Sequence, residues 1–185
     1  MNNLTKQAIA VSLMKLLNER PIAQISVKDI CTDCGLNRQT FYYHFQDIYD
    51  LLFWIVRKDI SSYYQLENLS PASMSDYLYS LFRYCQNHSR IIRHAYNPAN
   101  RVRYETAFRD ASEPLLRHKI ESYENYRLVS KEDADILISF YAYSAAALFF
   151  RWLESGMPQS FEASFSKYCM ILDESVNALL LKFSK

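Results

Sequence analysis

The segment Ser26–Leu52 reads SVKDICTDCGLNRQTFYYHFQDIYDLL, and its first part has the pattern of two short helices joined by a tight turn. Ser26 is a favoured N-cap residue, and Asp29 three positions later forms a short version of the capping box, so a helix of about two turns begins here. Gly35 ends that helix, because glycine readily takes the left-handed conformation that follows a helix. A short helix, a glycine turn and a second short helix are the parts of a helix-turn-helix.

The second helix is expected from Arg38 to His44, with Asn37 as its N-cap. Four apolar residues are expected to anchor the pair of helices, namely Ile30, Leu36, Phe41 and Phe45. The outward positions of the second helix are rich in hydrogen-bond donors and hold no acid: Arg38, Gln39, Thr40, Tyr42, Tyr43 and His44. Such side chains suit the base edges and phosphates of duplex DNA. The alternative is a packing unit that never meets DNA, since similar shapes occur in many all-α proteins.

Helical patterns continue on both sides of this segment and predict an all-α protein. One helix precedes it, from Leu4 to about Arg20, where Pro21 stops it. Asp47 can cap a long helix that follows it. Further on, the apolar periodicity predicts helices at 75–87, 89–96, 101–126, 131–155 and 160–183. Pro114 is expected to kink or break the helix at 101–126.

The composition becomes loop-like at residues 65–75, QLENLSPASMS. We therefore divide the chain there. We expect residues 1–64 to form a DNA-binding domain with the helix-turn-helix and a connecting helix, and residues 65–185 to form a helical domain for dimerisation and effector binding.

Composition bounds the class of protein. The 185 residues are half hydrophobic and 15% aromatic, with two glycines, which indicates a helical globule with a substantial core. Residues 1–60 carry seven Lys or Arg against six Asp or Glu, and the rest carries fourteen of each, so gross charge does not reveal a nucleic-acid binder. Scattered cysteines and an N-terminus unlike a signal peptide indicate a reduced, cytoplasmic protein. The longest uncharged stretch, 136–150, is too short to span a bilayer, so no membrane partner is expected.

The segment Ser26–Leu52 resembles the DNA-binding signature of TetR-type transcriptional regulators, and the all-helical remainder is similar to theirs in length and layout. Residues 151–158, RWLESGMP, resemble the branch that contains regulators associated with dihydroxyacetone kinase genes. The resemblance implies a ligand-responsive repressor that binds a palindromic operator as a dimer.

The resemblance also implies which residues contact DNA: Ser26, Lys28, Arg38, Gln39, Thr40, Tyr42, Tyr43 and His44. Thr40 and Tyr42 would touch backbone phosphates, and His44 would lie against the backbone. Ser26 and Lys28 would hold the flanking strand, while the other three face bases or nearby phosphates.

One position departs from the family pattern. Where the family usually has a lysine, just after the turn that follows Phe45, this sequence has Ile48. Losing one phosphate cation should weaken DNA binding and flatten its salt dependence by about one counterion. The departure favours the alternative function, a coactivator or adaptor of the same fold that acts through a protein partner.

The helix at 131–155 is apolar on two faces. One face carries Leu137, Tyr141, Ala145, Leu148 and Trp152, and the other carries Ile136, Phe140, Tyr143, Ala147 and Phe150. A helix that is apolar almost all round must be covered on both sides. We predict that it forms a two-fold homodimer together with the last helix. The alternative is that both helices are simply central core.

The middle helices could enclose a small-molecule effector, as the resemblance implies, with an aromatic lining of Phe82, Tyr84, Tyr96, Tyr104, Phe108 and Trp152. Aromatic residues at helical spacing also form any ordinary core. No acid occurs between Asp76 and Glu105, where five arginines lie. That run is either a solvated basic face or a site for an anionic effector or for auxiliary DNA contacts.

No pattern of catalytic or metal-binding residues accompanies these features. Cys31 and Cys34 lack a second pair at zinc-finger spacing, and the four histidines lie in separate segments. No nucleophile elbow, phosphate loop or carboxylate pair occurs. We therefore expect no cofactor, no metal and no enzyme, and a small-molecule-binding enzyme is only a remote alternative.

Overall fold

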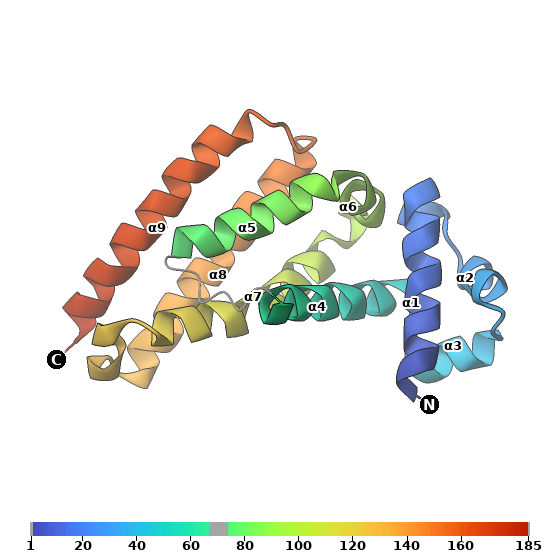
Figure 1. Cartoon of the computed structure of the whole chain (residues 1–185), viewed down its shortest axis with the longest axis horizontal. Coiled ribbons are helices and arrows are strands. Elements are labelled where there is room, and N and C mark those ends of the chain that lie inside the picture. Colours follow the sequence, from blue (N-terminus) through green and yellow to red (C-terminus); the bar gives the residue numbers. More distant parts are fainter. Residues whose placement is uncertain (1, 67–73, 185) are drawn as a thin grey trace. The chain divides into compact units, whose positions relative to one another are not determined.

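The computed structural model describes residues 2–66 and 74–184, and those residues form α-helices and 3-10 turns without any strand (Figure 1). The predicted all-α class is confirmed. The helices divide into two compact units. The first contains Met1–Leu66 with His88–Tyr104, and the second contains Glu67–Asn87 with Glu105–Lys185.

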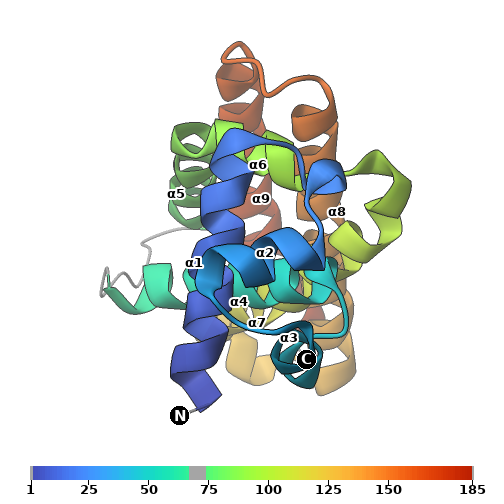
Figure 2. The ribbon, with the colours of Figure 1, turned by 90° about the vertical axis from the view of Figure 1, so that its right-hand side faces the viewer.

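The first unit holds the N-terminal helices. They are α1 (Asn2–Glu19), α2 (Val27–Cys34), α3 (Arg38–His44), α4 (Ile48–Leu66), α6 (Ser89–Ala95) and the 3-10 turns η1 (Ile22–Gln24) and η2 (Pro98–Asn100). The first residues of α7 (Arg101–Glu121) also belong to it. Figures 1 and 2 show α2 beside α1, with α3 following it.

The core of this unit comes from its first four helices. Six side chains are fully buried: Ile9, Leu13, Leu17, Ile30, Phe41 and Leu51. The buried Ser12 hydroxyl on α1 lies 3.1 Å from the Ile30 carbonyl oxygen and 2.6 Å from an Asp33 carboxylate oxygen. Lys15 also pairs with Asp33. These polar contacts fix α2 on α1 beside the apolar core.

Helix α6 packs in the first unit although it follows α5 in the chain. The His94 Nδ1 atom lies 2.7 Å from the carbonyl oxygen of Leu17, in the last turns of α1. Each unit therefore combines two stretches that are separated in the sequence but in contact in the folded chain. Most of the predicted boundary loop, residues 67–73, lies outside the described residues, and the division into 1–64 and 65–185 stays a prediction.

The second unit contains α5 (Met74–Asn87), most of α7, the 3-10 turn η3 (Glu124–Leu128), α8 (Lys131–Glu154) and α9 (Phe161–Phe183). Helix α5 runs alongside α9 (Figure 1), where the Phe82 and Phe165 rings stack with centroids 4.6 Å apart. Two hydrogen bonds join α8 to α9: the Tyr168 hydroxyl donates to Ser144 Oγ at 2.7 Å, and the Tyr141 and Ser175 hydroxyls lie 3.0 Å apart.

Helix α7 ends at Glu121 rather than at residue 126, so its predicted end was wrong. It continues through Pro114 without a break, which was one of the two effects expected of this proline. After Glu121 the backbone switches to i to i+3 hydrogen bonds, from Ser122 N to Lys119 O and from Tyr123 N to Ile120 O. Such bonds tighten the last turn of a helix, and here they lead into η3.

Helix α8 is long and apolar enough, by length and composition alone, to cross a membrane. Half of its most apolar stretch is buried inside the second unit. A core helix passes the same test, so this finding is weak evidence for a membrane span.

Candidate nucleic-acid interface

Helix α2 and the turn after it have the predicted geometry. The Ser26 hydroxyl accepts from Asp29 N at 3.2 Å, and the Asp29 carboxylate accepts from Ser26 N at 2.9 Å, which completes the capping box. Gly35 has φ +68°, the left-handed conformation in which a side chain is strained. Leu36 N then donates to Cys31 O at 3.0 Å and closes the end of α2.

Helix α3 is capped by Asn37, whose side-chain oxygen accepts from Thr40 N at 2.7 Å and from the Thr40 hydroxyl at 2.9 Å. Phe41 is fully buried and Phe45 is 3% exposed, so one side of the helix is anchored in the core. Tyr42 is 58% exposed and Tyr43 is 79% exposed. A helix held on one side therefore presents two tyrosines on the other.

The eight predicted DNA-contact residues all keep an accessible surface. Six of them are exposed: Ser26, Lys28, Arg38, Gln39, Tyr42 and Tyr43. Thr40 and His44 are half-buried. The hydroxyls of Ser26 and Thr40 donate to Asp29 and Asn37 within the helix caps, so in this arrangement neither hydroxyl has a proton to donate to a phosphate.

All four carboxylates between Ser26 and Leu52 accept hydrogen bonds within the first unit. The backbone N–H and hydroxyl of Ser26 lower the pKa of Asp29, and hydrogen bonds from Lys15 and then Ser12 lower that of Asp33. Asp50 accepts from Gln46 N at 3.0 Å. Partial burial alone would raise the pKa of Asp47, but hydrogen bonds from Arg103 and the backbone hold it below its ordinary value. Three of the four carboxylates pair with a cation, Asp29 with Arg20, Asp33 with Lys15 and Asp47 with Arg103, which reduces their repulsion of phosphates.

The sequence analysis missed two contacts made by cations near α3, although Arg103 belongs to the arginine run for which auxiliary DNA contacts were one alternative. The Lys6 ammonium group on α1 lies 5.6 Å from the ring centroid of Phe45 and 5.9 Å from that of Trp54. Arg103 on α7 pairs with Asp47, directly before α4. Both residues lie far along the chain from α3, and no pattern of nearby residues in the sequence predicts such contacts.

Replacing Asn37 with alanine tests the cap of α3. We expect the free energy of unfolding to fall by about 1 kcal/mol, because Thr40 N loses its acceptor. Urea denaturation of the full chain measures this change. Asn37→Ser is the matched control, since serine is also a good N-cap and should retain most of the stability. Equal losses in the two variants would contradict the capping role.

The structure brings together only three of the six residues that were predicted to line an effector pocket. Phe82, Phe108 and Trp152 line one cavity in the second unit, with Phe149, Phe161 and Phe165 among their neighbours. Its volume of about 30 Å³ has room for one or two water molecules rather than for an organic ligand.

The other predicted lining residues lie elsewhere. Tyr84 is half-buried on α5, outside the lining of this cavity. Tyr96 and Tyr104 belong to the first unit, where their rings pack with centroids 5.2 Å apart. No cluster of three or more His, Cys, Asp or Glu suited to a metal occurs among the described residues.

Two segments of the chain, which together include the helix-turn-helix and most of the second unit, match models of known protein families. Residues 9–54 match the model for bacterial regulatory proteins of the TetR family, and residues 72–173 match the model for a transcriptional regulator C-terminal region of the same family. The chain belongs to the TetR family. It is a DNA-binding transcription regulator with a helix-turn-helix, and the matched families and relatives are regulators rather than enzymes.

Two curated relatives are similar to parts of this TetR-family chain. One is the HTH-type dhaKLM operon transcriptional activator DhaS of Lactococcus lactis, 36% identical over 72 residues, and the other is the HTH-type transcriptional regulator SAB2452 of Staphylococcus aureus, 30% identical over 73 residues. The matches cover 35% and 39% of this chain and only 38% and 40% of the relatives' lengths.

Solved structures share the fold over almost the whole chain. The dihydroxyacetone kinase operon activator DhaS superposes with a TM-score of 0.61 at 22% identity and covers 98% of both chains. A TetR-family regulator from Streptomyces coelicolor gives a TM-score of 0.58 at 13% identity, covering 98% of this chain and 88% of its own. The predicted resemblance to the TetR family is thus confirmed.

Proposed function

We propose that this regulator binds a palindromic operator as a homodimer through the outward face of α3. The observation that carries the proposal is the contrast along α3 and its C-cap, where buried Phe41 and Phe45 flank exposed Tyr42 and Tyr43. A helix that reads DNA in the major groove must be exposed, carry hydrogen-bond donors and be held in place by the core, and α3 meets these requirements. We place this activity in the cytoplasm.

The second unit offers a surface for the second copy. On α8, Ile136, Phe140 and Tyr143 are each about 60% exposed, at the spacing of one helix face. On α9, Met170, Ile171 and Leu181 are 58–64% exposed. Phe150, expected on the same face of α8, is 2% exposed because it packs against Phe108 and Phe149. Exposed apolar stripes on two helices support a two-fold interface.

The regulator could act as a repressor that an effector releases, which is the function we propose first. The second candidate is an activator or coactivator that works with a protein partner. The Lactococcus relative is an operon activator, and this fact and the small size of the aromatic cavity both favour the second candidate.

Quantitative gel shifts on the DNA upstream of the protein's own gene test operator binding, with a scrambled duplex as control. We expect a salt-sensitive shift of the upstream duplex and a far weaker shift of the scrambled one. Release by a metabolite would support the repressor. Binding without release, together with transcription that rises in a reporter assay, would support the activator. Equal affinity for both duplexes would refute operator recognition.

Replacing the half-buried Ile48 with lysine tests the departure from the family pattern. We expect tighter DNA binding, with the slope of log affinity against log salt steeper by about one counterion. Fluorescence anisotropy over a salt series measures both. Ile48→Gln removes the apolar side chain without adding charge, so it should leave the slope unchanged. An unchanged slope in the lysine variant would show that this position does not face a phosphate.

A further inference from the structure

The junction between α3 and α4 carries negative charge and no cation of its own. Between Arg38 and Arg57 the chain contains Asp47 and Asp50 but neither lysine nor arginine. Asp47 stands three residues after the end of α3 and caps α4, its Oδ1 atom accepting from Asp50 N at 2.8 Å. A carboxylate so close to a DNA-binding helix repels phosphates unless a cation neutralises it.

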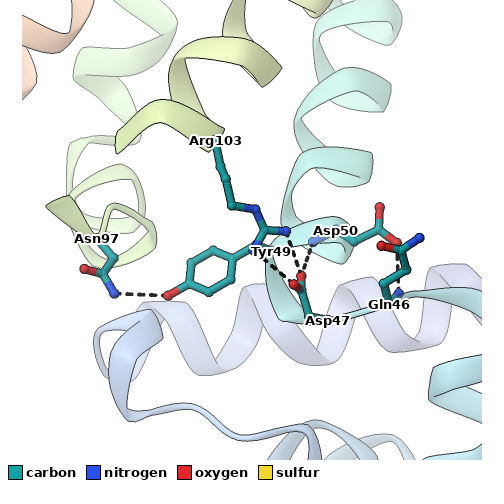
Figure 3. Close-up of polar contacts among 6 residues, drawn as sticks. All are labelled: Gln46, Asp47, Tyr49, Asp50, Asn97 and Arg103. Atoms are coloured by element: carbon teal, nitrogen blue, oxygen red, sulfur yellow. Dashed lines mark hydrogen bonds and ion pairs between the residues drawn. The ribbon is translucent and has the colours of Figure 1, made fainter. Parts of the chain in front are cut away.

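Arg103, in the first turn of α7, supplies that cation from 56 positions along the chain. Its two terminal nitrogens donate to the two Asp47 carboxylate oxygens at 3.0 and 3.1 Å, a two-point contact that fixes direction as well as distance (Figure 3). The guanidinium carbon also lies 5.1 Å from the Tyr49 ring centroid and 5.7 Å from that of Phe53.

A second contact holds the same turn of α4. Asn97 Nδ2 donates to the Tyr49 hydroxyl at 3.0 Å, and the Tyr49 and Tyr104 rings meet edge to face with centroids 6.1 Å apart. Asn97, which caps η2, and the first turn of α7 therefore both contact the beginning of α4. The polar contacts converge there in Figure 3.

We propose that Arg103 is a positioning residue for DNA binding: it neutralises Asp47 and holds the α3–α4 junction in the orientation that presents α3 to the groove. The inference rests on the proposed operator binding through α3. Arg103 acts through Asp47 and has no need to touch DNA.

The exposure of the pair separates this role from a purely structural one. The Arg103 and Asp47 side chains are 43% and 44% exposed. Solvent-exposed ion pairs contribute little to stability. Loss of Arg103 should therefore leave the protein folded, and its main effects should appear in DNA affinity and in the local order of the junction.

The decisive experiment combines charge removal with its rescue. We expect Arg103→Gln to weaken operator binding about tenfold at unchanged melting temperature, because Asp47 becomes an unpaired anion beside the phosphates. Adding Asp47→Asn should restore affinity to within about threefold of the wild type, since asparagine still caps α4 and carries no charge. Arg117→Gln is the matched control. Arg117 lies on α7 like Arg103, but it belongs to the second unit, where it pairs with Asp135 on α8 at 2.8 Å. This variant should not change affinity.

The salt series distinguishes positioning from direct contact. If Arg103 itself bound a phosphate, Arg103→Gln would flatten the salt slope by about one and Asp47→Asn would not rescue binding. That result would overturn the proposal.

Amide hydrogen exchange of the free protein supplies a readout that does not depend on DNA. We expect faster exchange at residues 46–50 in Arg103→Gln and no change there in Arg117→Gln. Unchanged exchange in Arg103→Gln would overturn the positioning role. Failure of the wild type to bind any duplex would instead count against operator binding itself, so the two failures are distinguishable.

Discussion

Tyr42→Ala is expected to abolish the specific gel shift, with a loss of operator affinity of about ten- to a hundredfold. The Tyr42 side chain is 58% exposed on α3, one position after the buried anchor Phe41. Its removal takes the hydroxyl that we propose to bind a phosphate, together with an apolar ring, from the proposed interface while the core of the first unit stays intact. The melting temperature should therefore change little, and anisotropy with a labelled operator measures the affinity.

Tyr42→Phe isolates the contribution of the hydroxyl, because it retains the ring that meets Phe41 edge to face at 5.5 Å. We expect an intermediate loss of affinity if the hydroxyl donates to a phosphate. Wild-type affinity in the alanine variant, at equal fold, would remove Tyr42 from the interface. It would also require a different face of the first unit to meet DNA.

Phe140→Arg is expected to convert the protein into a monomer of 21.8 kDa and to weaken operator binding by about a hundredfold or more. Phe140 is 60% exposed in the middle of the apolar stripe on α8, so the change is tolerated within one chain. In a two-fold interface each arginine would be buried without a counter-ion, which is costly. Light scattering at micromolar concentration measures the mass.

Leu128→Arg is the matched control for that variant. Leu128 is 59% exposed, lies in η3 of the same unit and is outside the proposed interface. We expect it to remain dimeric with wild-type affinity. A dimer in both variants would place the contact between copies elsewhere, while a monomeric wild type would refute the homodimer.

Local hydrogen bonds explain why the helix-turn-helix could be predicted from the sequence. The caps by Ser26, Asn37 and Asp47 each join residues three positions apart, and all three are confirmed. The buried anchors Phe41 and Phe45 follow from helical spacing around the same caps. The caps depend on neighbours in the chain, and any fold that kept the segment helical would retain them.

Contacts between distant segments could not be predicted in this way. The burial of each aromatic side chain in the second unit depends on which helix it meets, and the spacing along its own helix does not specify that partner. Phe150 illustrates this dependence: its spacing placed it on the same face of α8 as the exposed Ile136 and Phe140, but packing against Phe108 and Phe149 buries it.

The helix class, the capped helix-turn-helix and the character of the α3 surface could be predicted from the sequence, because they depend on side chains within one or two helical turns of each other. Packing between distant segments brings His94 to α1 and pairs Arg103 with Asp47. Such pairings lie 77 and 56 residues apart along the chain. They form only when packing brings together donors and acceptors that have no local signal in common.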